Sequence, residues 1–203
     1  MITIIDYDAG NMKSVQKAFE YLGEEVVFTR DRQTILGAPK LVLPGVGAFG
    51  DAMGKLRQYD LEEPVRNYIR SGKPFMGICL GLQLLFESSE ETPGIEGLGV
   101  LKGRILRFPD NMGLKIPHMG WNSLDFPKDG RLFDNIPQNP YVYFVHSYYL
   151  QAADLSDVAA TSTYGLTFHA AVEHENVFAC QFHPEKSSGT GLRILQNFAD
   201  MKL

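Results

Sequence analysis

Short apolar runs alternate with amphipathic stretches through the first half of the chain. The run Ile2–Ile5 is apolar apart from one threonine and ends at Asp6, which is typical of a strand buried on both faces. Apolar residues then recur at helical spacing from Met12 to Leu22, and Gly23 ends that stripe. The alternation continues with strands expected at residues 25–29, 41–43 and 74–78 and helices expected at residues 61–72 and 80–87. This order predicts a parallel sheet with helices on both faces.

The second half of the chain changes period. Segments rich in β-branched and aromatic residues predict strands at residues 141–150, 157–164, 167–173 and 177–182. Helical spacing returns near the end of the chain, at Leu192, Leu195 and Phe198. No repeat or linker separates the two halves. We therefore expect residues 1–203 to form one α/β domain, a flavodoxin-like three-layer sandwich whose mostly parallel central sheet has an antiparallel extension in the C-terminal half.

Composition and charge narrow the class of protein. The 203 residues are 44% hydrophobic with a net charge of −5, so the chain can fill a core but offers no basic surface for nucleic acid. No apolar run approaches the ~18 residues of a membrane span, and the first residues do not resemble a secretory signal. Two cysteines cannot make a disulfide framework. We expect a cytoplasmic protein that binds neither nucleic acid nor a membrane.

A glycine-rich segment after the third expected strand admits three interpretations. Gly45, Gly47 and Gly50 match the G-x-G-x-x-G pattern of dinucleotide-binding loops. However, the next strand ends at Cys79, where ribose binding requires Asp or Glu. The segment can instead present backbone amides to a reaction centre, or serve as a simple turn between a strand and a helix. A nucleotide site is the weakest of the three on these residues.

Cys79 stands between Gly77 and Gly81, where an expected strand meets the following helix. This is the cysteine counterpart of the G-x-S-x-G turn, in which small neighbours let strand and helix approach closely. Free amides at the helix start favour the thiolate, and the amide of Leu80 would face the oxyanion that forms during attack. A free cysteine is more often a buried core residue, and Cys180 fits that description better.

A cysteine nucleophile needs a base, and the base needs an orienting group. His183 and Glu185 flank a proline directly after the last expected strand. If extended geometry continues through the proline, their side chains point to the same side. Glu185 can then hold one imidazole nitrogen while the other faces Cys79. The remaining histidines, including His118 and His146, lack metal-ligand spacing and are better explained as hydrogen-bonded structural residues, so no metal or cofactor is expected.

These motifs resemble those of the class I (triad) glutamine amidotransferases. Segments 77–83 and 182–185 carry the resemblance to the family. Segments 6–11, 44–49, 117–122, 143–148 and 183–187 resemble the members of it that supply ammonia in histidine biosynthesis. One departure, Leu82 in place of a frequent methionine, conserves volume. The resemblance implies hydrolysis of glutamine through a cysteine thioester, in a heterodimer with a (β/α)8-barrel cyclase subunit.

The resemblance also implies roles for individual residues. The implied catalytic triad is Cys79, His183 and Glu185. The implied oxyanion hole uses the backbone amides of Val46 and Leu80. The residues implied to bind glutamine are Gly45, Gln83, Glu91, Ser147 and Tyr148. The residues implied to lie near the cyclase interface are Trp121, Tyr143 and Lys186.

Two other functions stay open at this point. A free-standing cysteine hydrolase on a similar sheet would use the same nucleophile, and a partner-binding module that lost turnover would keep the fold. Gln83 together with the His-Pro-Glu segment disfavours the first alternative. The complete set of Cys79, His183 and Glu185 disfavours the second.

Overall fold

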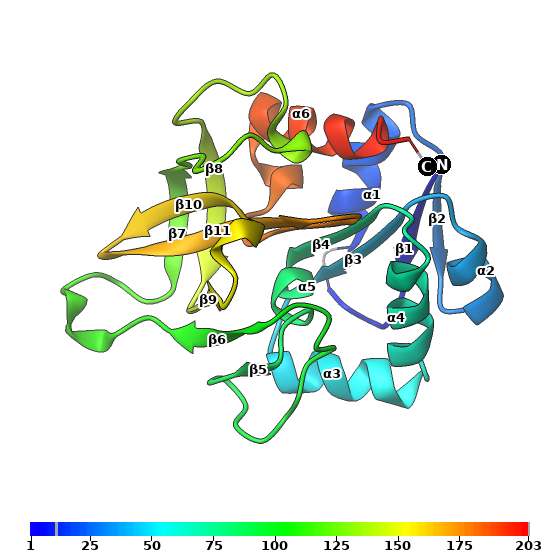
Figure 1. The fold of residues 1–203 in the computed structure, drawn as a ribbon, viewed down its shortest axis with the longest axis horizontal. Coiled ribbons are helices and arrows are strands. Elements are labelled where there is room, and N and C mark those ends of the chain that lie inside the picture. The colour runs from blue at the N-terminus through cyan, green and yellow to red at the C-terminus, as the bar shows by residue number, and fades with distance from the viewer. Residues whose placement is uncertain (11, 203) are drawn as a thin grey trace.

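The computed structural model describes residues 1–10 and 12–202, so Asn11, the last residue of the segment 6–11, lies outside it. A ten-stranded sheet forms the centre of the described molecule, in the order β2-β1-β3-β4-β12-β11-β9-β6-β5 with β10 beside β11 (Figure 1). Its parallel half contains β1 (Ile2–Ile5), β2 (Val26–Thr29), β3 (Leu41–Gly45), β4 (Phe75–Cys79) and β12 (Val177–Cys180). The predicted parallel sheet is confirmed.

Helices cover both faces of this sheet, as Figure 1 shows. One face carries α1 (Met12–Tyr21) and α6 (Ser188–Ala199), and the other carries α2 (Arg32–Gly37), α3 (Phe49–Gln58) and α4 (Glu62–Arg70). The apolar runs of the strands serve both layers, because Val42 packs into the core with α1 while its neighbours Leu41 and Leu43 pack into the opposite core. The predicted three-layer α/β sandwich is therefore confirmed.

The C-terminal half extends the sheet with antiparallel strands. They are β11 (Leu166–His174), β10 (Val158–Tyr164), β9 (Tyr148–Ala152) and β6 (Gly103–Arg107), and the short β5 (Ser88–Ser89) pairs with β6 in parallel. The strand expected at residues 141–150 is divided at Ser147. Its first part, β8 (Tyr141–His146), leaves the central sheet and pairs with β7 (His118–Ser123), while β9 stays in it.

The helix expected at residues 80–87 is shorter than predicted. Helix α5 spans only Leu80–Gln83. Beyond it, the carbonyls of Leu84, Leu85 and Phe86 accept hydrogen bonds from backbone amides of residues 98–101. Because those carbonyls are used by a distant segment, the helical ladder ends early. No helix in the described part of the chain has both the length and the apolar character that crossing a bilayer requires.

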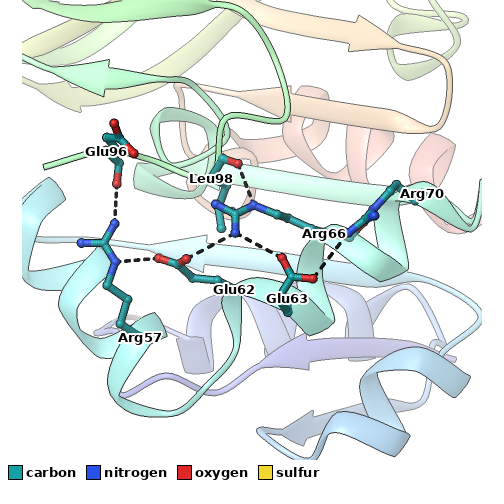
Figure 2. Close-up of polar contacts among 7 residues, drawn as sticks. All are labelled: Arg57, Glu62, Glu63, Arg66, Arg70, Glu96 and Leu98. Atoms are coloured by element: carbon teal, nitrogen blue, oxygen red, sulfur yellow. Dashed lines mark hydrogen bonds and ion pairs between the residues drawn. The ribbon is translucent and has the colours of Figure 1, made fainter.

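Two arginines hold the loop between β5 and β6 against α3 and α4 (Figure 2). Arg57 donates from its guanidinium to the Glu96 carbonyl at 2.8 Å, and Arg66 donates to the Leu98 carbonyl at 2.9 Å. Glu62 bonds to both arginines, at 2.7 Å and 3.3 Å, and so joins them. Partly exposed ion pairs add little stability individually. Their effect here is to fix the path of a loop that reaches the candidate site.

Candidate active site

The nucleophile candidate lies at a sharp turn between β4 and α5. Cys79 has φ +54° and ψ −108°, a backbone conformation that residues with a side chain rarely adopt. A Cβ on Gly81 would overlap the Leu43 carbonyl of β3, and a Cβ on Gly77 would lie 2.7 Å from the Gly81 carbonyl. The two glycines therefore let the start of α5 rest directly on the backbone of the sheet, as the sequence predicted.

We expect Gly81→Ala to lower the free energy of unfolding by about 3 kcal/mol, because the Leu43 backbone and the start of α5 must move apart to admit the new methyl group. Gly54→Ala is the matched control. Gly54 is exposed within α3 and has nothing within 4 Å of an added Cβ, so that variant should gain about 0.5–1 kcal/mol. Urea denaturation measures both. Equal stabilities for Gly81→Ala and the parent chain would contradict the close packing.

His183 and Glu185 form a buried pair just beyond β12. The Nδ1 atom of His183 lies 2.8 Å from Glu185 Oε1, and the two side chains are 2% and 0% exposed. The predicted contact is present, but the predicted extended geometry is wrong. Residues Pro184–Lys186 form a 3-10 turn, because the proline begins a turn there rather than continuing the strand. The carboxylate accepts from Nδ1, so Nε2 is the nitrogen left to face the cavity.

Opposing effects set the charge of His183. Burial disfavours the imidazolium, but Cys79 and Glu185 outweigh it and raise the pKa of His183 to about 10. The Nε2 atom of His183 makes no hydrogen bond of ordinary geometry within the described residues. His183 and Cys79 line the same cavity. A protonated imidazole at neutral pH is the form that stabilises a thiolate beside it.

A cavity of about 380 Å³ opens over the sulfur of Cys79. The predicted site residues that line it are Val46, Cys79, Leu80, Gln83, Glu91, Ser147, Tyr148 and His183. Gly47, from the glycine-rich segment expected to present amides to a reaction centre, also lines it, and three further lining residues were not expected there, namely Pro117, Val145 and His146. Gly45 lies behind the cavity, against the hydroxyl of Tyr7, which donates to the Pro44 carbonyl at 2.7 Å.

Two polar side chains are placed for recognition inside this cavity. Glu91 Oε2 accepts from the backbone amide of Phe49 at 2.7 Å, which holds the carboxylate at the start of α3. The Nε2 atom of Gln83 donates to Gln181 Oε1 at 3.0 Å and to the Tyr148 carbonyl at 3.3 Å. The protein thus uses the amide nitrogen of Gln83, and its amide oxygen is the atom suited to a ligand. The described residues contain no cluster of His, Cys, Asp and Glu that could hold a metal ion.

The three residues predicted near a partner interface lie together outside the central sheet. The Trp121 ring on β7 meets the Tyr143 ring on β8 edge to face, with centroids 6.2 Å apart. Lys186 Nζ lies 5.9 Å from the centroid of the Tyr143 ring. Trp121 is 51% exposed, and the nearby Met119 and Tyr141 are also exposed. An exposed patch of large apolar side chains is typical of a protein-binding surface.

Comparison with known families identifies the chain. The model of the family "Glutamine amidotransferase class-I" matches residues 3–201. The chain belongs to this family. This match confirms the resemblance that segments 77–83 and 182–185 predicted for this class-I glutamine amidotransferase.

Full-length relatives place this amidotransferase more closely. A protein named imidazole glycerol phosphate synthase subunit HisH from Syntrophotalea carbinolica is 52% identical over 206 residues, covering 99% of this chain and 100% of the relative. A protein of the same name from Rhodopirellula baltica is 54% identical over 199 residues, covering 98% and 97%. The amidotransferase therefore groups with the HisH subunits.

Solved structures share its fold at low sequence identity. PurLQS from Thermotoga maritima has a TM-score of 0.76 at 20% identity, covering 98% of this chain and 97% of that one. A structure described as a glutamine amidotransferase has a TM-score of 0.75 at 21% identity, covering 98% and 100%. These structures show that the amidotransferase fold persists where four residues in five differ.

Proposed function

We propose that this amidotransferase hydrolyses glutamine to glutamate and ammonia with Cys79 as the nucleophile, His183 as the general base and acid, and Glu185 as the group that orients the imidazole. One observation carries the proposal. Cys79 lies on a strained turn and lines the same cavity as His183. The Nδ1 atom of His183 is held at 2.8 Å by the buried carboxylate of Glu185. Such a constellation suits nucleophilic attack on a carbonyl carbon.

The reaction follows from this geometry. The Cys79 thiolate attacks the side-chain carboxamide of glutamine and forms a tetrahedral intermediate. His183 gives the proton on Nε2 to the departing nitrogen, so ammonia leaves and a γ-glutamyl thioester remains. His183 then takes a proton from water, the resulting hydroxide attacks the thioester, and glutamate departs as the thiolate is restored. Glu185 keeps the proton on Nδ1 through both steps, which leaves Nε2 free to exchange its own.

Each step places negative charge on the former amide oxygen. We assign its stabilisation to the backbone amides of Leu80, directly after the nucleophile, and Val46, in the loop on the opposite wall. For the substrate itself, Glu91 suits the α-ammonium group and the Gln83 amide oxygen suits the reacting carboxamide nitrogen. Backbone groups of Ser147 and Tyr148, which line the cavity, would complete the binding site.

We further propose that the ammonia passes to a (β/α)8-barrel cyclase subunit, which converts PRFAR to imidazole glycerol phosphate and AICAR in histidine biosynthesis, in the cytoplasm. The relatives at 52% and 54% identity are subunits of imidazole glycerol phosphate synthase, which supports a heterodimer. Ammonia reacts only while unprotonated, because ammonium has no lone pair. A sealed contact between subunits therefore serves the chemistry, and the exposed patch around Trp121 suits it.

Mixing the chain with its cyclase subunit tests this proposal. We expect a one-to-one complex and glutamine turnover that rises when the complex forms. Trp121→Ala should weaken the complex by about 30-fold in Kd, because an anchoring tryptophan contributes about 2 kcal/mol. Tyr21→Ala is the control, since Tyr21 is 78% exposed on α1, away from β7 and β8. Absence of a complex, or equal losses in both variants, would overturn the proposed interface.

A further inference from the structure

A buried amide that the mechanism above does not use touches the nucleophile. Gln181 lies just past the end of β12 and is 0% exposed. Its Nε2 atom lies 3.7 Å from Cys79 Sγ, within range of an N–H···S hydrogen bond. A thiolate is a much better acceptor than a neutral thiol or a thioester sulfur. A donor at this place therefore acts mainly on the charged form of the nucleophile.

The direction of the Gln181 amide is fixed by a chain of contacts that begins at a backbone carbonyl. The carbonyl of Tyr148 can only accept, so the Gln83 atom that lies 3.3 Å from it is the amide nitrogen. That nitrogen also contacts Gln181 at 3.0 Å, so the Gln181 atom there is the oxygen. The nitrogen of Gln181 must then point to the sulfur of Cys79.

The same carbonyl is also held by the buried His146, which is in turn bonded to the buried His118. His146 Nδ1 lies 2.8 Å from the Tyr148 carbonyl and so carries a proton. His146 Nε2 lies 3.0 Å from His118 Nδ1. A neutral His146 accepts at Nε2, which makes His118 Nδ1 the donor of that bond. The ring of His118 is further fixed by stacking on Phe144 and Tyr164, with centroids 4.9 Å and 4.0 Å away.

Asn122, at the other end of this series of hydrogen bonds, sets the same donor and acceptor roles independently. Asn122 Oδ1 accepts from the Ser123 amide at 2.9 Å, and Asn122 Nδ2 donates to the Thr163 carbonyl at 2.9 Å. The atom of Asn122 that lies 3.4 Å from His118 Nε2 is therefore a donor, so His118 Nε2 accepts. Both imidazoles are neutral in this arrangement, in agreement with burial, which lowers the pKa of His118 to about 4 and of His146 to about 3.

We propose that Gln181 is a further catalytic residue that stabilises the Cys79 thiolate through an N–H···S bond, and that Gln83 is a positioning residue that fixes the direction of this donor. His146 and His118 are positioning residues that hold the Tyr148 carbonyl to which Gln83 is bonded. The proposal rests on the function proposed above. It assigns the bond two effects. The thiolate fraction is larger at neutral pH, and the sulfur leaves more readily when water breaks down the thioester.

Gln181→Met tests the donor, since methionine has a similar length and volume but no N–H group. Iodoacetamide alkylates the thiolate of Cys79, and mass spectrometry separates this product from one at Cys180. We expect the midpoint of the alkylation rate against pH to rise by about 1 to 2 pH units, the size expected for a lost hydrogen bond to a charged group. At pH 7, kcat for glutamine should fall by about 10- to 100-fold with little change in KM, and higher pH should restore part of it.

Two further variants separate this role from a structural one. Gln181→Glu keeps the shape but places a carboxylate beside the sulfur, so the alkylation midpoint should rise further than in Gln181→Met. Gln151→Met is the matched control, because Gln151 is exposed on β9, and its profile should equal that of the parent chain. An unchanged midpoint in both Gln181 variants would overturn the proposal. The assay needs no glutamine, so this failure is distinct from failure of the glutaminase proposal itself.

The histidine pair has its own test in the parent protein. Nitrogen-15 NMR between pH 6 and 8 should show His146 protonated at Nδ1 and unprotonated at Nε2, with the same tautomer for His118. His118→Phe keeps a stacked ring but removes both of its hydrogen bonds, so the Cys79 alkylation midpoint should rise by a smaller amount than in Gln181→Met. The opposite tautomers, or an unchanged midpoint in His118→Phe, would show that the two histidines do not position the Gln181 donor.

Discussion

Replacement of Cys79 by serine is expected to lower kcat for glutamine hydrolysis by about 10⁴-fold or more. The hydroxyl of serine is far less acidic than a thiol, and the imidazolium of His183 favours a charged sulfur rather than abstracting a proton from an alcohol. Glutamate release measures the loss. The magnitude follows the loss seen when a nucleophile is removed from other enzymes that form covalent intermediates.

Ammonia supplied from outside is the control for Cys79→Ser. The variant should still bind the cyclase, and the complex should make product from an ammonium salt at the rate of the parent complex. This result would confine the defect to the release of ammonia. Glutamine turnover within tenfold of the parent rate would show that another residue performs the attack.

Glu185→Gln is expected to lower kcat by about 10³- to 10⁴-fold. Glutamine keeps the shape of the buried side chain but loses the charge that selects the proton on Nδ1 of His183 and stabilises the imidazolium. The pKa of His183, raised to about 10 in the parent chain, should fall. NMR titration of the imidazole and steady-state kinetics measure the two effects on the same sample.

The same substitution changes how stability depends on pH. A raised pKa in the folded state means that the charge of His183 stabilises the fold fully below about pH 6.5, its unfolded value, and that this contribution is lost as pH rises toward 10. Glu185→Gln should therefore flatten the decline in unfolding free energy over this range. Glu63→Gln is the control, because Glu63 is 61% exposed in an ion pair with Arg66. An unchanged slope in Glu185→Gln would contradict the charge assigned to His183.

Local sequence was sufficient where a feature depends on neighbouring residues. The apolar run Ile2–Ile5 predicts a strand between two layers because each face of it needs a partner. The turn at Cys79 is predicted because its flanking glycines are the residues that the close approach requires. The pairing of His183 with Glu185 was also predicted, although a 3-10 turn brings them together rather than an extended segment.

Features that depend on distant segments were missed. The split between β8 and β9 at Ser147 cannot be deduced from apolar alternation, because β8 pairs with β7 and β9 pairs with β6. The early end of α5 depends on amides of residues 98–101. His146 was predicted only as a hydrogen-bonded structural residue, which its bonds to His118 and Tyr148 confirm. Gln181 drew no prediction within the expected strand at residues 177–182. Only the fold shows that His146 lines the cavity and that the Gln181 amide contacts Cys79. A buried polar residue in an apolar strand was the one available signal.

The strained backbone conformation of Cys79 has a consequence for the evolution of this sequence. Its positive φ stores about 1–3 kcal/mol, and glycine at this position would release that strain. Selection for a stable fold therefore favours the loss of the nucleophile, and only selection for nitrogen supply opposes it. In lineages that take their nitrogen from free ammonium, we expect the loss of glutaminase activity to begin with replacement of Cys79. The resulting protein would have a larger free energy of unfolding than its ancestor.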